Sequence, residues 1–289
     1  MTTLNYERRG IGTPIVLLHG IGSHWQVWSP VIDQLAADHD VIAVDLPGYG
    51  DSVPLPPGTQ PGINSIADAL EHFLDAIDVP AAHLVGNSLG GWLALELAKR
   101  DRALSVTALS PGGFADAREA AYVRQSLKLS VRLVRGLGVF GDRIVATGVG
   151  RTLLLSQLVA KPRKMPATAA ASSLRALASA PSFDNDLASI SHDRFSGGEQ
   201  ILAPVTIAWG QRDRLLFPRQ GRRAVQEIPG ATGVTLRGCG HVPTFDDPKQ
   251  VTSVILSTIA SSTGEQLPRA HTKEDPELQP CDNHGFHTN

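Results

Sequence analysis

Three side chains in this sequence could together turn a hydroxyl group into a nucleophile. Ser88 lies in Gly86-Asn87-Ser88-Leu89-Gly90, which fits the pattern G-x-S-x-G. Asp213 and His241 follow in the order Ser, Asp, His that a nucleophile turn of this kind requires. In such chemistry the histidine takes the serine proton and the aspartate orients the imidazole. We therefore expect Ser88 as nucleophile, His241 as general base and Asp213 as its orienting acid.

Each of these positions also has a plain structural explanation when it is taken alone. A G-x-S-x-G stretch can be an ordinary turn, and Asp213 can be a solvated loop acid or a cap for a helix after Pro218. A lone histidine such as His241 is commonly a surface residue. The context decides, because Ser88 follows an expected strand and opens an expected helix, while Asp213 and His241 each come just past an expected strand.

The elements that must position these residues follow an alternating pattern. Short apolar runs that end in glycine or proline alternate with stretches of helical period, which predicts an α/β fold with a mostly parallel sheet. The runs are nearly continuous in apolar residues, as in strands covered on both faces. The expected strands are Ile15 to Leu18, Val41 to Val44, His83 to Val85, Val106 to Leu109, Val205 to Trp209 and Val234 to Leu236. The expected helices are Ile63 to Ile77, Leu89 to Lys99 and Pro248 to Ile259.

A second glycine-marked turn follows the first of these strands, at His19-Gly20-Ile21-Gly22. A flexible loop there can offer the Ile21 N–H across from Ser88, although a simple β-turn would also explain the glycines. The helix that begins at Leu89 directs its own N–H groups toward a developing oxyanion. We expect Ile21 and Leu89 to form an oxyanion hole.

Other segments argue against a nucleotide or metal cofactor. Neither Gly20-x-Gly22 nor Gly48-x-Gly50 completes a dinucleotide fingerprint, because Trp25 and Val53 occupy the third glycine position. No metal-ligand set with recognisable spacing is present, so we expect no metal and no cofactor.

The bulk properties narrow the class of protein further. A formal net charge of -2 over 289 residues gives no reason to expect nucleic acid as a partner. The first residues lack the pattern of a secretory signal, and no apolar run is long enough to span a bilayer. Two cysteines, Cys239 and Cys281, make no disulfide framework. We expect a cytoplasmic protein that acts on a small molecule; nothing in the sequence indicates its oligomeric state.

The middle of the chain departs from the alternating rhythm. Residues 112–200 contain no convincing strand and show helical period around Tyr122 to Val134, which predicts an all-helical insertion. It divides a core formed by residues 1–111 and 201–262. Aliphatic residues nearly vanish after that, so residues 263–289 are expected to be a disordered tail.

The insertion is also strongly basic. Eleven Lys or Arg stand against two acids between Arg118 and Arg175, and Arg124, Lys128, Arg132 and Arg135 recur at helical spacing. A solvated helix face is the simple interpretation. The alternatives are a rim that attracts anionic substrates and a surface that makes weak contact with an anionic membrane.

Together the motifs resemble those of the α/β-hydrolase superfamily from about residue 4 to residue 259. The resemblance implies an eight-stranded, mostly parallel sheet with flanking helices, a helical cap at residues 112–200 inserted after the sixth strand, and the oxyanion hole named above. The stretches that carry it are LLHGIGSHWQVW (17–28), DLPGYGDS (45–52), GNSLGG (86–91), WGQRDRLLFP (209–218) and GCGHVPTFDDP (238–248).

The resemblance also separates this chain from some relatives. Haloalkane dehalogenases and epoxide hydrolases of this fold carry aspartate at the position of Ser88. The GNSLGG turn is similar to that of meta-cleavage C–C hydrolases, which usually have a longer glycine-rich loop where this chain has Ser23, His24 and Trp25 after Gly22.

The expected activity is hydrolysis of a small to medium carboxylic ester with an apolar acyl or alcohol part, by way of an acyl-enzyme. A C–C bond hydrolase, a lactonase and a cofactor-free perhydrolase would use the same residues, and a ligand-binding member of the fold is the non-enzymatic alternative. The residues expected to line the substrate pocket are Gly20, Trp25, Trp92, Phe114, Leu215 and Val242.

Overall fold

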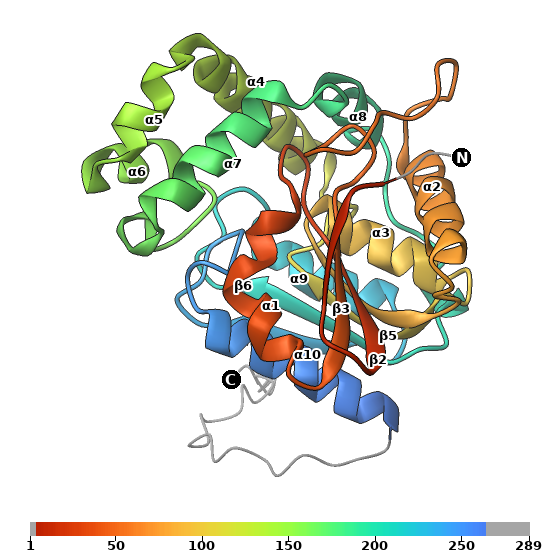
Figure 1. Cartoon of the computed structure of the whole chain (residues 1–289). Helices are drawn as coiled ribbons and strands as arrows, with labels where there is room; N and C mark the ends of the chain where they lie inside the picture. Colours follow the sequence, from red (N-terminus) through yellow and green to blue (C-terminus); the bar gives the residue numbers. More distant parts are fainter. Residues whose placement is uncertain (1–3, 264–289) are drawn as a thin grey trace, which may run out of the picture.

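A seven-stranded sheet forms the centre of the protein, in a computed structural model that describes residues 4–263 (Figure 1). Its strand order is β1-β3-β2-β4-β5-β6-β7. β1 runs antiparallel to β3, and every other neighbouring pair is parallel. The strands are β1 (Tyr6–Arg9), β2 (Thr13–Leu18), β3 (His39–Val44), β4 (Ala82–Asn87), β5 (Ala103–Leu109), β6 (Val205–Gly210) and β7 (Thr232–Leu236).

The strand count corrects one expectation. The described residues form seven strands where eight were expected, so the helical insertion follows the fifth strand, β5, and not the sixth. Six of the seven coincide with the apolar runs in the sequence. The seventh, β1, reads Tyr-Glu-Arg-Arg and is mostly exposed, because it lies at the sheet edge and needs little apolar side-chain area.

Alternate side chains of the inner strands, β2 to β6, enter two separate hydrophobic cores. Val16 and Leu18 of β2 pack on the side of α2 (Ile63–Ala76) and α3 (Leu89–Ala98). Ile15 and Leu17 pack on the opposite side, against α1 (Ser29–Leu35) and α10 (Pro248–Thr263). Helices thus cover both faces of the sheet, which explains why its inner strands are continuous apolar runs. α9 (Arg219–Glu227) contacts β6 and β7.

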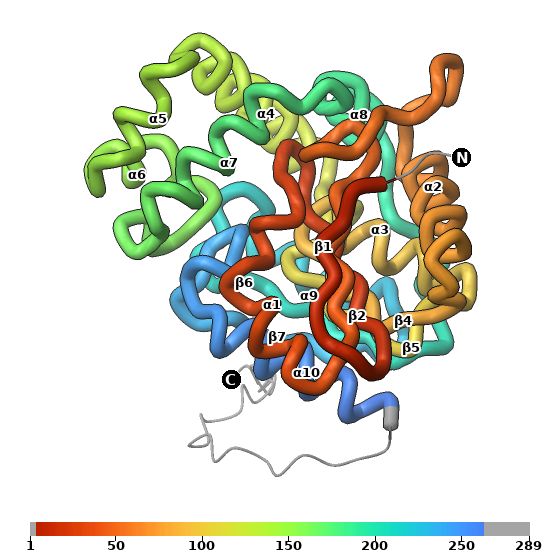
Figure 2. Tube along the Cα trace, in the orientation of Figure 1, coloured from red at the N-terminus to blue at the C-terminus, as the bar shows by residue number. Residues whose placement is uncertain are grey.

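Between β5 and β6 the described chain forms helices and no strand. These are α4 (Ala117–Leu137), α5 (Phe140–Val145), α6 (Gly148–Leu155), α7 (Ala167–Ser179) and α8 (Phe183–Ile190). They lie together beyond one end of the sheet, as the tube view shows (Figure 2). α4, α5, α6 and α7 enclose a third hydrophobic cluster of their own. We refer to residues 112–200 below as the helical insertion.

α4 begins with a complete capping box. The Asp116 carboxylate accepts the N–H groups of Arg118 and Glu119, each at 2.9 Å, and the Glu119 side chain accepts the Asp116 N–H at 2.9 Å. This cap starts the helix five residues before the periodic stretch that was apparent in the sequence.

Polar contacts join the helical insertion to the rest of the protein at several places, among them those of Glu119, Asp246 and Tyr49. Glu119, whose side chain is 1% exposed, contacts both Arg219 and Arg223 of α9. The Asp246 carboxylate accepts the N–H groups of residues 160 and 161 at 2.8 and 2.7 Å. Tyr49 donates its hydroxyl to Asp186 of α8 at 2.8 Å.

Two remaining expectations concern the C-terminal tail and the absence of a membrane-spanning segment. Thr263 is the last residue of α10, and residues 264–289, where a disordered tail was expected, lie outside the described part. Of the helices in residues 4–263, none has the length and apolar character needed to cross a bilayer. The expected cytoplasmic location stays a prediction.

Candidate active site

Ser88 occupies a sharp turn between β4 and α3. Its backbone has φ +58° and ψ −115°, a conformation that is costly for a residue with a side chain. The turn is held on both sides, because the Ser88 N–H donates to the Leu109 carbonyl at 3.0 Å and its carbonyl accepts the Gly112 N–H at 2.9 Å. The fixed backbone directs the hydroxyl out of the sheet edge.

The glycines of the motif are required by close packing. A Cβ atom on Gly86 would lie 2.0 Å from the Gly90 carbonyl oxygen, and one on Gly90 would lie 2.1 Å from the Leu18 carbonyl oxygen. Both separations are far shorter than any real contact, so neither position tolerates a side chain. G-x-S-x-G is therefore a packing requirement of this turn.

His241 and Asp213 form a buried pair beyond the ends of β7 and β6. The His241 Nδ1 atom lies 2.8 Å from Asp213 Oδ2, and their side chains are 3% and 0% exposed. The other carboxylate oxygen, Oδ1, accepts the N–H groups of Leu215 and Leu216, each at 2.9 Å. These amides fix the carboxylate, the carboxylate accepts a hydrogen bond from the Nδ1–H group, and Nε2 is left free to accept a proton.

Ser88 and His241 line the same cavity. Within residues 4–263 the Ser88 hydroxyl makes no hydrogen bond. Catalytic hydrogen bonds are often long in unliganded sites. Gly20 leaves room beside the hydroxyl, since a Cβ there would come within 3.1 Å of the Ser88 Cβ.

Two backbone amides beside Ser88 are free to bind an anion. The Ile21 N–H lies in a loop and the Leu89 N–H in the first turn of α3, and neither donates a hydrogen bond inside the described chain. Both residues line a cavity together with Ser88. This placement is what an oxyanion hole requires.

The Ile21 loop is anchored by a buried histidine. The His19 Nδ1 atom donates to the Gly20 carbonyl at 2.8 Å, and Nε2 accepts the Leu46 N–H at 3.0 Å. Burial lowers the pKa of His19 to about 4, so the ring is neutral at physiological pH. That state matches one donating and one accepting ring nitrogen. His19 thus positions the loop that presents the Ile21 N–H.

Two polar residues that hold the loop of His241 were not identified as part of the site from the sequence. Asn87 donates its side-chain N–H₂ to the His241 carbonyl at 2.9 Å and to the Leu109 carbonyl at 3.0 Å. Asp246 accepts the Gly240 N–H at 2.7 Å. The available signal was a polar residue at a fully buried strand end for Asn87, and an acid five residues after the histidine for Asp246.

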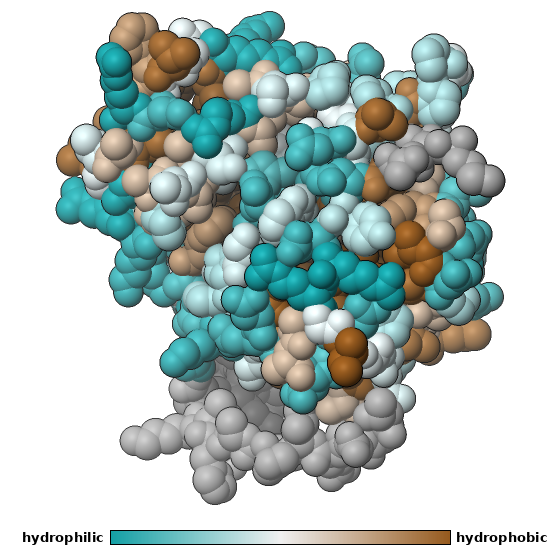
Figure 3. All heavy atoms as spheres, in the orientation of Figure 1, coloured by the Kyte–Doolittle hydropathy of each residue, from teal (hydrophilic) through white to brown (hydrophobic). Residues whose placement is uncertain are grey.

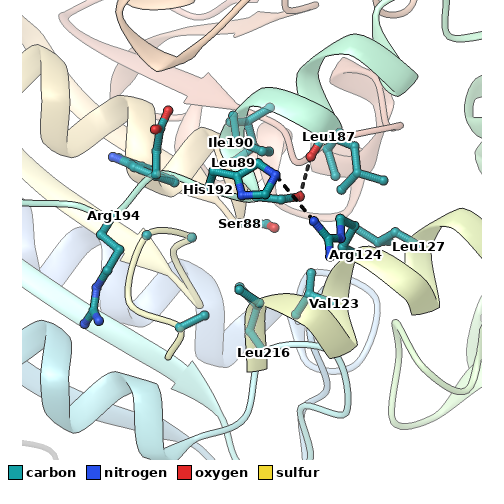
Figure 4. A pocket seen from close by; sticks show the side chains of 18 of the residues that line it. Ser88, Leu89, Val123, Arg124, Leu127, Leu187, Ile190, His192, Arg194 and Leu216 are labelled. Carbon is teal, nitrogen blue, oxygen red and sulfur yellow. Dashed lines mark hydrogen bonds between the residues drawn. The ribbon is translucent and has the colours of Figure 1, made fainter. Parts of the chain in front are cut away.

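Ser88 lies between two cavities of different character. One, of about 350 Å³, runs between α3, α4 and the segment after α8. Arg124 and His192 face each other across it, with 3.4 Å between Arg124 Nη1 and His192 Nε2, while Arg194 points away from Ser88 (Figure 4). The other, of about 100 Å³, reaches His241 and is mostly apolar. Its lining includes Leu127, Val134, Leu154, Met165, Leu174 and Phe245.

Four of the six expected pocket residues line these cavities. Trp92 lines the larger cavity, Gly20 and Val242 line the smaller one, and Leu215 lines both.

Trp25 and Phe114 do not take the expected places. The Trp25 backbone N–H is held by Asp45 Oδ1 at 2.7 Å, and the residue lines a separate surface depression with His24 and Gln26. Phe114 is buried in the core with its ring 5.3 Å from that of Phe195. Both residues stand next to a motif in the sequence, but neither lines a cavity that Ser88 lines.

The comparisons with known proteins place this arrangement in a family. A family model described as the alpha/beta hydrolase family matches residues 15–254. The chain is 30% identical over 260 residues to the dihydrolipoyllysine-residue acetyltransferase component of the acetoin cleaving system of Cupriavidus necator. That match covers 83% of this chain and 62% of the relative, so this chain spans less than two thirds of the relative's length.

Two further similarities cover most of both proteins. The chain is 30% identical over 268 residues to a pimeloyl-acyl-carrier-protein methyl ester esterase of Xanthomonas campestris pv. campestris, covering 87% of this chain and 97% of the relative. A thermophilic esterase from Thermogutta terrifontis has a similar fold, with a TM-score of 0.70, 22% identity, and coverage of 90% of this chain and 93% of the esterase. The chain belongs to the alpha/beta hydrolase family.

Proposed function

We propose that this member of the family is a serine hydrolase that cleaves carboxylic esters through an acyl-enzyme. The observation that carries the proposal is the buried His241–Asp213 pair in the cavity of Ser88, with two free backbone amides alongside. The similarity to a methyl ester esterase supports an ester as the bond that is cleaved.

In the first half of the reaction, Ser88 Oγ attacks the ester carbonyl carbon while its proton moves to His241 Nε2. Asp213 stabilises the imidazolium that results, since its Oδ2 already binds Nδ1. The carbonyl oxygen gains the negative charge and binds the N–H groups of Ile21 and Leu89, each worth about 3 kcal/mol. The imidazolium then gives its proton to the departing alcohol, which leaves the acyl group on Ser88.

In the second half, water takes the place of the alcohol. His241 removes a proton from the water, the hydroxide attacks the acyl carbonyl, and Ser88 leaves with the proton returned by His241. The two cavities offer separate places for the acyl and alcohol parts of the substrate. The smaller cavity suits an aliphatic group, because most of its lining is apolar and burial of apolar surface favours binding there.

The decisive experiment combines covalent labelling with turnover. A fluorophosphonate probe should label Ser88 in the folded protein, and p-nitrophenyl esters of increasing chain length should be hydrolysed with a preference among them. Ser88→Ala should abolish both, whereas Ser261→Ala, an exposed serine on α10, should change neither. Labelling or turnover that survives in Ser88→Ala would refute the mechanism.

A lactone and a vinylogous diketone assayed beside the esters distinguish the related reactions. Ester turnover at least tenfold faster than that of either compound is expected. Faster turnover of the diketone or the lactone would replace the ester assignment while keeping the same residues. A folded protein that neither labels nor turns over any of the three would indicate a ligand-binding role.

A further inference from the structure

Large apolar side chains are exposed at one end of the helical insertion. Twelve large hydrophobic residues are exposed within the described chain, and six of them fall between residues 129 and 153. They belong to α4, the α4–α5 connection, α5 and α6, which contact one another in that order. Figure 3 shows brown, hydrophobic residues at the upper left, over this end of the molecule. The six, which we call the apolar end surface, are Leu129 (69% exposed), Leu133 (51%), Val139 (83%), Phe140 (61%), Val149 (60%) and Leu153 (75%).

Their exposure is not explained by the packing of the helical insertion. Leu127 and Val134 of α4 already supply the buried face of that helix, and Leu155 does the same for α6. The exposed residues therefore lie on the opposite face, turned away from the core. Single exposed leucines are normal on protein surfaces, but a group of six on adjoining helices indicates a binding surface.

Cations without acidic partners surround this surface. Lys128, Arg132 and Arg143 lie on the same helices as the apolar residues, and Arg163 and Lys164 lie in the short 3-10 helix Pro162–Lys164, which contacts α6. None of the five side chains pairs with a carboxylate of residues 4–263. These helices carry two acids, and both are already paired: Asp142 with Arg175 at 2.6 Å, and Glu119 with Arg219 and Arg223. The apolar end surface thus has a positive rim.

One cation is also coupled directly to an apolar side chain. The Arg143 guanidinium lies 5.8 Å from the centre of the Phe140 ring. A cation at the base of an exposed aromatic ring can stay at the level of lipid phosphates while the ring enters the acyl region.

We propose that the apolar end surface and its cations bind the surface of an anionic lipid bilayer. Exposed aliphatic and aromatic groups beside unpaired Lys and Arg match the apolar interior and the negative headgroups of such a bilayer. A second copy of the chain matches less well, because a symmetric contact would set these cations against one another.

The surface also lies close to the candidate active site. Leu127 and Val134, on the inner side of α4, and Leu154, on the inner side of α6, line the apolar cavity that reaches His241. Docking by the outer sides of the same helices would bring that cavity next to the lipid. On the basis of the proposed ester hydrolysis, the natural substrate would then be a lipophilic ester taken from the bilayer; the docking itself does not depend on that activity.

Vesicle co-sedimentation of the full chain tests the docking. Vesicles of phosphatidylcholine with a minority of phosphatidylglycerol should bind the protein, pure phosphatidylcholine should bind it at least tenfold more weakly, and added salt should reduce binding. The double variants Leu133→Ser/Phe140→Ser and Arg132→Glu/Arg143→Glu should each lower the partition coefficient about tenfold. Ser88→Ala should bind like the wild type.

Matched controls keep the test specific. Ile11→Ser/Leu202→Ser alters residues that are 87% and 86% exposed but lie outside the helical insertion, so binding should not change. The three double variants should hydrolyse a short, water-soluble ester as the wild type does, which shows that they fold. Absence of vesicle binding, or equal loss in the control, would overturn the docking even if ester hydrolysis stands. A dimer in light scattering that the Leu133→Ser/Phe140→Ser variant dissociates would replace the bilayer by a second copy.

Discussion

The carboxyl edge of the sheet and the helical insertion beyond it hold their side chains by different means. At the sheet edge, Ser88, Asp213 and His241 are fixed by backbone hydrogen bonds and by glycines that admit no side chain. In the helical insertion, the residues that line the cavities are held by packing between helices. The difference suggests that the edge determines the reaction, while the insertion determines which molecules reach it.

Removal of the Asp213 carboxylate charge, which orients His241 at the sheet edge, should have the largest effect on kcat. Asp213→Asn should lower kcat about 10³- to 10⁴-fold, because an amide group disfavours the tautomer with the proton on Nδ1. The fall should be equal for short and long esters, measured by steady-state kinetics. Asp33→Asn, at a carboxyl group that is 80% exposed, is the control and should leave kcat unchanged. A fall that depends on chain length would contradict the division between edge and insertion.

The second largest effect is expected where Glu119 of the helical insertion contacts α9 of the core, and it concerns the stability of the fold. Glu119→Gln removes the buried charge that faces Arg219 and Arg223 and leaves their guanidinium groups next to each other. We expect a loss of about 3 kcal/mol in the free energy of unfolding, at the low end for buried pairs because both arginines are partly exposed.

Urea unfolding followed by circular dichroism measures this loss. Asp184→Asn removes the exposed partner of Arg135 on the same helical insertion and should cost no more than about 0.5 kcal/mol. Equal effects of the two variants would mean that Glu119 does not join the regions.

Filling the apolar cavity should alter selectivity and leave the chemistry intact. Leu154→Trp adds volume to a residue that lines the cavity, so kcat/KM for long-chain esters should fall about tenfold relative to an acetate ester. The neighbouring Leu153 is 75% exposed, which makes Leu153→Trp a matched control with no expected change in the ratio. An equal fall in kcat/KM for the acetate ester would mean that Leu154 also affects the catalytic residues. The helical insertion would then not act on selectivity alone.

The same difference explains what could be predicted from the sequence. Ser88, Asp213 and His241 were identified because glycines and strand ends are local signals, and the structure brings His241 and Asp213 into contact beside Ser88. The catalytic roles themselves stay predictions. The strand β1 was missed because a charged edge strand lacks an apolar run.

The cavities could not be predicted in the same way. Which side of a helix or loop faces Ser88 depends on contacts between distant residues, such as Asp246 with the segment at residues 160 and 161. For this reason Trp25 and Phe114, both close to a motif in sequence, were assigned to the pocket, although Trp25 lines a separate depression and Phe114 is buried in the core. Asn87 was overlooked because its partner, the His241 carbonyl, is distant in the sequence.

The smallest expected effect concerns the contact between Tyr49 of the core and Asp186 of α8. Burial raises the pKa of Asp186 to about 6, above the value of about 3.9 expected for an unfolded chain. The folded state therefore binds the proton more tightly, and stability is lost as the pH rises from about 4 to about 6. Above pH 6 the buried carboxylate is ionised, with the Tyr49 hydroxyl at 2.8 Å as its hydrogen-bond donor.

Asp186→Asn should remove that penalty while its amide oxygen still accepts the Tyr49 hydroxyl. We expect about 1 kcal/mol more stability at pH 8 and no gain at pH 4, measured as the shift in Tm at the two pH values. Asp184→Asn, at an exposed carboxyl group of the same helix, should show no such pH dependence. A gain of equal size at both pH values would mean that the substitution improves packing, and that ionisation of Asp186 does not weaken the contact between core and insertion.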